Sequence, residues 1–331
     1  MSTGVACLVA FAASLAAVRV LERRGGAIGL LDVPNDRSLH VDPRPRGGGI
    51  GILIGVCAAL VILWWAGVAA DSPVRLVLAA SLAIALTGLW DDIRHLPILP
   101  RLVMQMAMAL VLVVSLGPFA TLPLPSPFNV PLAVLSTPLT VAWVVGVTNF
   151  VNFMDGADGL AGGQATLSLS LLGWAAWPSP VATVALVAAA ATAGFLVRNW
   201  APARIFLGDV GSAWLGFVLA ALPLAAPASS RESLVFAIAV SLTLFLVDPA
   251  LTLMRLAWRG HRIGVAHREH AYQRLIRRRG VHAPVVGALL TGAGVLCAAA
   301  AVALIRPPLA WGVVALACAM ASAEFWLAAR D

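Results

Sequence analysis

Four polar segments of this chain hold residue types that suit phosphate and metal-ion chemistry. The first is the adjacent pair Asp91 and Asp92, which directly follows an apolar run. Two neighbouring carboxylates repel each other, and beside an apolar segment this repulsion is costly unless a cation or hydrogen-bond donors offset it. A solvated loop would also accommodate such a pair, so both interpretations stay open for it.

The second segment, residues 149–161, has the sequence NFVNFMDGADGLA. Asn149 and Asn152 are three residues apart, so they share a helix face if the preceding helix continues. Asp155 and Asp158 repeat this spacing, and each is followed by a glycine that permits a tight turn. Amides and carboxylates in this order suit hydrogen bonding to a nucleoside and to a hydrated Mg²⁺. A polar turn would explain the glycines but not the ordered Asn and Asp.

The third segment is a single carboxylate, Asp209, which follows Gly208 and opens an apolar run. At the N-terminus of a helix, such a side chain suits a metal ion that also binds phosphate oxygens. An aspartate that only caps the helix is the alternative interpretation.

The fourth segment lies in the longest basic loop, where His267, Arg268 and His270 stand close together. Histidines spaced by three residues could form half of a zinc site, but no further His or Cys completes it. Arginine beside histidine fits a pyrophosphate better, because both donate hydrogen bonds to anionic oxygens. Together the four segments supply carboxylates for a divalent cation and cations for phosphates, which is what phosphoryl transfer requires.

The composition predicts that these segments are positioned by membrane-spanning helices. The chain is 61% hydrophobic and 11% charged, with a mean hydropathy of +0.94. Its apolar residues form blocks near the ~20 residues that cross a hydrocarbon core. We therefore predict an all-α integral membrane protein in a single polytopic domain, residues 1–331. Eleven spans are predicted, near residues 4–22, 49–70, 75–90, 101–117, 132–149, 161–177, 181–197, 212–226, 234–256, 284–305 and 309–327.

The distribution of arginine predicts how the chain crosses the membrane. Of 22 basic residues, none of which is lysine, 18 fall in the C-terminal tail and in segments 23–48, 91–101, 149–160, 198–211 and 255–283. Three fall in the opposite connectors, and Arg19 lies at the inner end of the first span. The larger group is therefore assigned to the cytoplasm, with the N-terminus outside and the C-terminus cytoplasmic. All four polar segments are then on the cytoplasmic face of a bacterial inner membrane. No predicted span has an ionisable residue near its middle, which disfavours a transporter.

The net charge of +7 does not indicate nucleic acid as a partner, because in a membrane protein such charges set topology and meet anionic lipid head groups. The four cysteines are scattered through apolar segments without a CxxC pair, so neither a disulfide framework nor a zinc framework is predicted. Asp248 is expected to be structural, as a partner of Arg255, and support of the site is the alternative.

The motifs, in this order, resemble the polyprenyl-phosphate N-acetylhexosamine-1-phosphate transferase family, of the glycosyltransferase family 4 type. This family also includes the phospho-N-acetylmuramoyl-pentapeptide transferase of peptidoglycan synthesis. The matching motifs run from Asp32 to His40, from Pro45 to Gly48, over Asp91-Asp92, from Asn149 to Ala161, from Phe206 to Ser212 and from His267 to Gln273. The resemblance implies ten or eleven helices, dependence on Mg²⁺ with Mn²⁺ as an alternative, undecaprenyl phosphate as acceptor, a UDP-sugar as donor and release of UMP.

The resemblance also implies roles for individual residues. Asp209 is the first candidate for the metal ligand, with Asp91, Asp92 and Asn152 as further candidates. Catalytic roles fall to Asp91, Asp92 and Asp209. Substrate contacts fall to Asn152, Asp155 and Asp158 on the nucleotide, to His267, Arg268 and His270 on the pyrophosphate, and to Arg101 and Gln105 on the acceptor. Asn149 is a further substrate-binding candidate. Because a phosphate monoester has a second pKa near ~6, Asp91 or Asp92 is expected to position groups rather than to act as a base.

The loop around His270 differs from that of the peptidoglycan enzyme, which has three consecutive histidines. It resembles the branch that begins O-antigen and related surface glycans, which favours a UDP-linked N-acetylhexosamine or its 6-deoxy relative. A peptidoglycan-type transferase, a lipid-glycan transporter and a non-catalytic scaffold are the alternatives. The oligomeric state, with a homodimer as one option, stays open.

Overall fold

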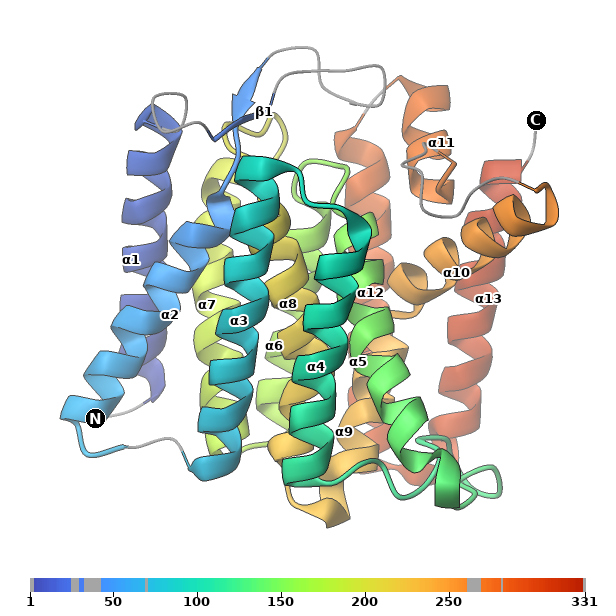
Figure 1. The fold of residues 1–331 in the computed structure, drawn as a ribbon. Helices are drawn as coiled ribbons and strands as arrows, with labels where there is room; N and C mark the ends of the chain where they lie inside the picture. The colour runs from blue at the N-terminus through green and yellow to red at the C-terminus, as the bar shows by residue number, and fades with distance from the viewer. Residues whose placement is uncertain are drawn as a thin grey trace.

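The computed structural model describes residues 3–24, 30–32, 43–68, 71–260, 269–280 and 282–329. Within these residues the chain is a bundle of helices, with one short antiparallel pair of strands, β1 (Leu31–Asp32) and β2 (Arg44–Pro45). Eight of the described helices are long and apolar enough to cross a membrane. The predicted class, an all-α integral membrane protein, is confirmed (Figure 1).

Each of the eleven predicted spans coincides with helical structure. The helices are α1 (Thr3–Arg24), α2 (Gly48–Trp65), α3 (Ser72–Arg94), α4 (Ile98–Leu116), α5 (Ser136–Phe153), α6 (Leu160–Ala175), α7 (Pro180–Asn199), α8 (Asp209–Ala221), α9 (Ala228–Ser241), α10 (Thr243–Trp258), α11 (Ala271–Arg279), α12 (Ala283–Ile305) and α13 (Ala310–Ala329). Short 3₁₀ turns, η2 (Ala133–Leu135), η3 (Leu222–Ala225) and η4 (Pro307–Leu309), adjoin α5, α8 and α13.

The prediction of one continuous span over residues 234–256 is wrong. This region contains two helices, α9 and α10, whose axes meet at 69°. If the bent pair counts as one span, the described residues contain up to nine spans rather than the predicted eleven. The other two predicted spans correspond to α6 and α8, which have only 16 and 13 residues. The apolar composition continues unchanged through the bend at Leu242, so hydropathy alone does not reveal it.

Helix α8 lies at the centre of the bundle, and every residue after its first is buried. It packs against α3, α5 and α2. The close approach depends on glycines: a Cβ atom on Gly49 would lie 2.3 Å from the Cα of Gly211, and one on Gly88 would lie 2.5 Å from the carbonyl oxygen of Asp209. The first turn of α8 is therefore held directly against the backbones of α2 and α3.

The polar connectors gather at one end of the bundle. Figure 1 shows the ends of α3 and α7, the start of α8 and the short helix α11 at this end, whereas α1 begins at the opposite end. Helix α13 ends at the same end as α11 (Figure 1). The described parts of the segments assigned to the cytoplasm thus share one face of the molecule, and their orientation in the membrane stays a prediction.

Candidate active site

The carboxylate of Asp92 holds the start of α8. Its two oxygens accept hydrogen bonds from the backbone N–H groups of Asp209 and Val210, each at 3.0 Å. Gly208 precedes the helix with φ +75°, and a Cβ there would lie 2.7 Å from Asp92 Oδ2. A carboxylate at a helix N-terminus stabilises the helix through its free N–H groups and its dipole. Asp92 therefore positions the backbone that carries Asp209.

Arg101 joins the other two acids of the predicted set. Its Nη1 atom donates to Asp209 Oδ2 at 2.7 Å and also to Asp91 Oδ2. The second oxygen of Asp91 accepts the backbone N–H of Leu96 at 2.6 Å. Asp91 is thus fully engaged and nearly buried, whereas the Asp209 side chain is 31% exposed. Of the three predicted catalytic acids, Asp209 has the most accessible carboxylate.

Gln105, Asn149 and Asn152 lie on the α4–α5 side of this centre. The amide nitrogen of Asn149 donates to Gln105 Oε1 at 2.6 Å, and the Ser212 hydroxyl donates to Asn152 Oδ1 at 2.5 Å. Together with Arg101 and Asp209, these three predicted residues line one narrow crevice between α3, α4, α5 and α8. The structure therefore brings together residues that are up to about a hundred positions apart in the sequence.

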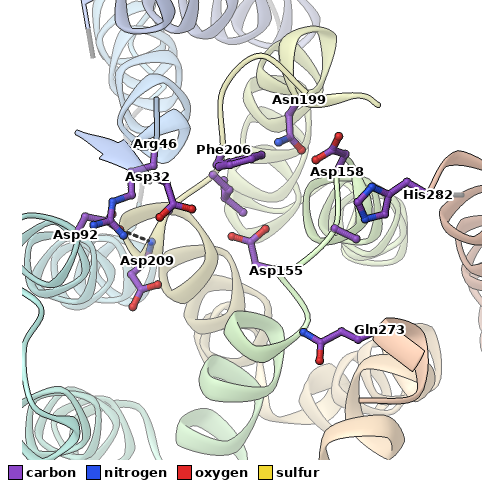
Figure 2. Close-up of a pocket in the computed structure, with 14 residues that line it drawn as sticks. Asp32, Arg46, Asp92, Asp155, Asp158, Asn199, Phe206, Asp209, Gln273 and His282 are labelled. Carbon is purple, nitrogen blue, oxygen red and sulfur yellow. Dashed lines mark hydrogen bonds and ion pairs between the residues drawn. The ribbon is translucent and has the colours of Figure 1, made fainter. Parts of the chain in front are cut away.

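A larger cavity of about 210 Å³ opens on the other side of Asp209. Figure 2 shows its polar side chains, with Asp209 and Arg46 on one side, Asp155 near the middle and Gln273 on the other side. The lining residues are Asp32, Arg46, Asp92, Asp155, Gly156, Ala157, Asp158, Asn199, Phe206, Leu207, Gly208, Asp209, Gln273 and His282. Asp209 lines both the cavity and the crevice.

The Asp155 carboxylate lies in unfavourable electrostatic surroundings in the cavity. Burial, together with the negative charges of Asp209, Asp92 and Asp158, holds the pKa of the Asp155 carboxyl well above its usual range. Like charges at short range favour the protonated form unless a cation is present. The polar cavity is therefore suited to a positive charge between Asp155 and Asp209.

The loops on either side of the cavity are tied by Asn199 and Asp158. Asn199 accepts the N–H of Gly159 at 3.0 Å and donates to the carbonyl of Ile205 at 2.9 Å. Asp158 accepts the N–H of Ala203 at 2.9 Å. The two predicted polar segments around residues 155 and 209 thus share walls of one cavity, although different helices carry them.

The histidine loop has a different arrangement from the predicted one. His270 is only 4% exposed, its ring stacks near those of Phe153 and Tyr272, and its Nδ1 atom lies 3.3 Å from Asp248 Oδ1. It does not line the cavity, so a direct contact between His270 and a pyrophosphate is not supported. The burial that a structural role requires is not visible in the sequence. His267 and Arg268 lie outside the described residues.

Asp248 is structural, as expected, but its predicted pairing with Arg255 is wrong. It is fully buried and accepts the backbone N–H groups of Ala271 and Tyr272 at 2.9 and 3.1 Å. It thereby caps α11. Arg255 instead lies 3.3 Å from Glu269. The partner of Asp248 follows from the bend between α9 and α10, which periodicity does not predict.

Several cavity residues were not predicted from the sequence. No role was predicted for Asn199, Gln273 or His282, and Arg46 lies within the matching motif from Pro45 to Gly48 without a predicted role of its own. Arg46 Nη1 lies 3.8 Å from Asp92 Oδ1. Gln273 could have been predicted, because it belongs to the matching motif from His267 to Gln273. No sequence pattern pointed to His282, which is a single histidine after a basic run.

The donor set suits a hard divalent cation. Among the residues that the structure describes, no group of three or more His, Cys, Asp or Glu side chains forms a ready-made metal site. Mg²⁺ does not need one, because it retains water and binds through one or two carboxylates plus substrate phosphates. Asp209 and Asp155, whose charges act on each other in the cavity, fit this requirement. Asn152 Oδ1 is already held by Ser212, so it is a weaker candidate ligand.

Comparisons with known proteins converge on one family. Residues 74–226 match the model described as glycosyl transferase family 4. The chain is 30% identical over 228 residues to the "Probable undecaprenyl-phosphate N-acetylglucosaminyl 1-phosphate transferase" of Bacillus subtilis, over 66% of this chain and 62% of the relative. It is also 30% identical over 228 residues to a decaprenyl-phosphate N-acetylglucosaminephosphotransferase of Mycolicibacterium smegmatis, over 62% of this chain and 54% of the relative. A Mycobacterium tuberculosis protein of the same name is 29% identical over 227 residues. The chain thus spans between about half and three-fifths of the length of these relatives.

Proposed function

Because the chain belongs to glycosyl transferase family 4 through residues 74–226, we propose that it transfers an N-acetylhexosamine-1-phosphate, or its 6-deoxy relative, from a UDP-sugar to undecaprenyl phosphate. The products are UMP and a polyprenyl-diphosphate-sugar. One observation carries the proposal: Asp209 lines both the polar cavity and the narrow crevice. A group in this position can serve two substrates that approach from opposite sides.

The cavity is assigned to the nucleotide sugar. Phe206 supplies an aromatic face on which a pyrimidine can stack. Asn199 and Asp158 supply amide and carboxylate atoms for the hydrogen bonds of the nucleoside. Arg46, next to Asp92, supplies a cation for the diphosphate.

The acceptor phosphate is assigned to the mouth of the crevice, whose interior of about 10 Å³ has room for no more than a water-sized group. Arg101 lines the crevice, and its guanidinium is held by Asp91 and Asp209. An arginine in this place can orient an incoming phosphate, while Gln105 and Asn149 complete the wall. Asp91, engaged by Arg101 and by the Leu96 N–H, acts by positioning Arg101.

The reaction is an in-line displacement. An oxygen of the acceptor phosphate forms a bond to the sugar-bearing phosphorus, and the bond from that phosphorus to the bridging oxygen breaks. UMP leaves with the bridging oxygen. The acceptor phosphate is largely deprotonated already at neutral pH, so no residue has to remove a proton. Mg²⁺ held by Asp209 and Asp155, with Mn²⁺ as an alternative, would neutralise charge on the phosphates during transfer.

We also propose a location and a pathway class. The arginine bias favours a bacterial inner membrane with the polar end of the bundle in the cytoplasm, where a UDP-sugar is available. The loop sequence around His270 favours the initiation of a surface glycan of the O-antigen type.

The test is UMP release by the purified protein in lipid nanodiscs. Undecaprenyl phosphate and Mg²⁺ are supplied with each of several UDP-sugars: UDP-GlcNAc, a UDP-linked 6-deoxy-N-acetylhexosamine and UDP-MurNAc-pentapeptide. We expect UMP release, and a lipid product of matching mass, only when both lipid phosphate and metal are present. Release with UDP-MurNAc-pentapeptide alone would contradict the surface-glycan assignment, and no release with any donor would contradict the transferase.

A further inference from the structure

A cavity at the end of the bundle opposite the active site has no role in the proposed reaction. It has a volume of about 640 Å³ and is lined by Thr3 and by residues within 60–68, 75–78 and 177–184; we call it the distal cavity. Figure 1 shows the start of α1, the end of α2 and the start of α3 together at this end. None of its lining residues lines the polar cavity or the crevice. Its size is within the about 300–1,000 Å³ that is usual for ligand sites.

The lining of the distal cavity changes from a polar and aromatic rim to an apolar interior. On α3, Arg75 lies in the first turn, and Leu78 lies on the same face one turn deeper. On α2, Trp64 lies next to the end of the helix, and Leu60 lies one turn deeper. Val184, in the second turn of α7, is buried. A rim and an interior of this kind suit a molecule with one polar end and one apolar end.

The rim lies at the level at which a membrane changes from hydrocarbon to head groups. Helices α1, α2, α3 and α7 are all long and apolar enough to cross a membrane, and the distal cavity lies at their ends. Trp64 and Trp177 line it and are 67% and 57% exposed. Tryptophan favours this interface, because its ring is apolar and its N–H group is polar. The apolar interior is therefore at the depth of the acyl chains.

The rim carries positive charge. Arg75 is the only ionisable residue that lines the distal cavity in the described part of the chain, so no carboxylate opposes it there. Helix α7 starts at the rim, where Ser179 accepts the N–H of Ala182, and a helix N-terminus adds partial positive charge. Asp71 accepts the N–H of Val74 and does not line the cavity. The rim therefore fits an anionic head group.

We propose that the distal cavity binds one anionic phospholipid, with its phosphate beside Arg75 and one acyl chain against Leu60, Leu78 and Val184. A free phosphate would leave the apolar interior without a ligand. The acceptor lipid of the proposed reaction is not the occupant, because its phosphate has to reach Arg101 at the other end of the bundle. The bound phospholipid joins α2, α3 and α7, and α2 and α3 hold the first turn of α8.

The test is the binding of defined lipids to the delipidated full chain in an uncharged detergent. Phosphatidylglycerol is compared with phosphatidylcholine of the same acyl chains, whose head group has no net charge, and with glycerol 3-phosphate, which has no acyl chain. Native mass spectrometry counts the bound lipids. Melting temperature reports stabilisation, since a ligand that binds only the folded chain raises it. We expect a phosphatidylglycerol site that binds phosphatidylcholine about tenfold more weakly and does not bind glycerol 3-phosphate.

Two variants alter the two parts of the site. Arg75→Gln removes the charge, so it should lower the affinity for phosphatidylglycerol by about tenfold and abolish the preference over phosphatidylcholine. Leu60→Trp fills the apolar interior, so it should lower the affinity for both lipids by about tenfold or more. Leu78→Phe replaces Leu60→Trp if the latter does not fold.

Each variant has a matched control that does not line the distal cavity. Arg306→Gln removes an exposed arginine between α12 and η4, and Leu82→Trp enlarges an exposed leucine of α3. Both should bind phosphatidylglycerol as the wild type does. Equal affinity of the wild type for the two lipids, unchanged affinity in the cavity variants, or the same loss in the controls would each overturn the proposal. UMP release is not measured, so a failure of the proposed transferase would leave this result intact.

Discussion

Two helix starts in this molecule are built in the same way but present different groups to the cavity. At α8, the carboxylate of Asp92 accepts the first two N–H groups of the helix; at α11, the carboxylate of Asp248 does the same. Both acids are buried. At α8 the first residue, Asp209, faces the cavity, whereas at α11 the first two residues are buried and the third, Gln273, lines it.

The two helix starts show which members of a motif are accessible to a ligand and which are used inside the fold. In each case a conspicuous ionisable residue is used to position a backbone: Asp92 at one junction, and Asp248 with His270 at the other. The residue that lines the cavity lies in the first turn of each helix: Asp209 is the first residue of α8, and Gln273 is the third residue of α11. A charge-assisted hydrogen bond to such a cap contributes about 1.5–3 kcal/mol, which is enough to fix the helix start and hence the side chain that follows.

The largest effect is expected at Asp209. Asp209→Asn keeps the shape of the side chain but removes the charge that serves both the cavity and the crevice, so UMP release should fall by at least about 10³-fold. Melting temperature should stay close to that of the wild type, because the Asp209 side chain is partly exposed and Arg101 keeps its ion pair with Asp91. Glu232→Gln, at the opposite end of the bundle, is the control and should retain turnover. Wild-type turnover by Asp209→Asn would contradict the assignment of the centre.

The comparison of the two caps is sharpened by Asp92→Asn and Asp248→Asn. Each variant turns an acceptor into an NH₂ group that opposes a backbone N–H, so each should lose about 1–3 kcal/mol of unfolding free energy. The two variants should differ in their effect on catalysis. Asp92→Asn displaces Asp209 and should lower kcat by about 10²-fold, whereas Asp248→Asn displaces Gln273 and should mainly raise the KM for the UDP-sugar. Identical kinetic changes in both variants would contradict the different roles assigned to the two helix starts.

Gly88→Ala tests whether α8 needs its close contact with α3. The added Cβ would lie 2.5 Å from the Asp209 carbonyl oxygen and 2.8 Å from the Val210 nitrogen. Backbone atoms cannot rotate away, so we expect a loss of about 1–3 kcal/mol of stability together with reduced turnover. Gly287→Ala on α12 has open space around its Cβ and should be neutral or slightly stabilising. Thermal unfolding of the two variants measures the difference.

The smallest effect is expected at Asp155 in metal-free protein. Its raised pKa means that the folded state binds the proton more tightly than the unfolded state, whose pKa is about 4. Stability is therefore lost as pH rises above that value through the folded-state pKa. Asp155→Asn should remove this slope and raise the melting temperature by a few degrees at neutral pH, while turnover falls. Added Mg²⁺ should stabilise the wild type more than the variant.

If the melting temperatures of the wild type and Asp155→Asn depend on pH in the same way, the pKa of the Asp155 carboxyl is not raised in the folded protein. Melting is followed in EDTA, because a bound cation would mask the repulsion.

Much of the helical fold was predictable, since each apolar run has a free-energy preference for lipid that does not depend on its neighbours. The bend at Leu242 and the amphipathic helix α11 were not, because the first lies within a uniformly apolar run and the second is rich in arginine. In the site, Asp209, Arg101, Gln105 and Asn149 were predicted and lie together. His270 was assigned to substrate on the strength of its residue type, and the structure buries it against Phe153.

Composition and short local patterns were sufficient to predict the membrane class, the helical segments, the family resemblance and the acidic character of the centre. Which atoms remain available to a ligand depends on how the helices pack together. Asp92 finds its partners 117 and 118 residues away, and Asp248 finds its own on a helix beyond a bend. A buried polar atom is satisfied by whatever the fold places beside it, so its availability is a property of the packed molecule.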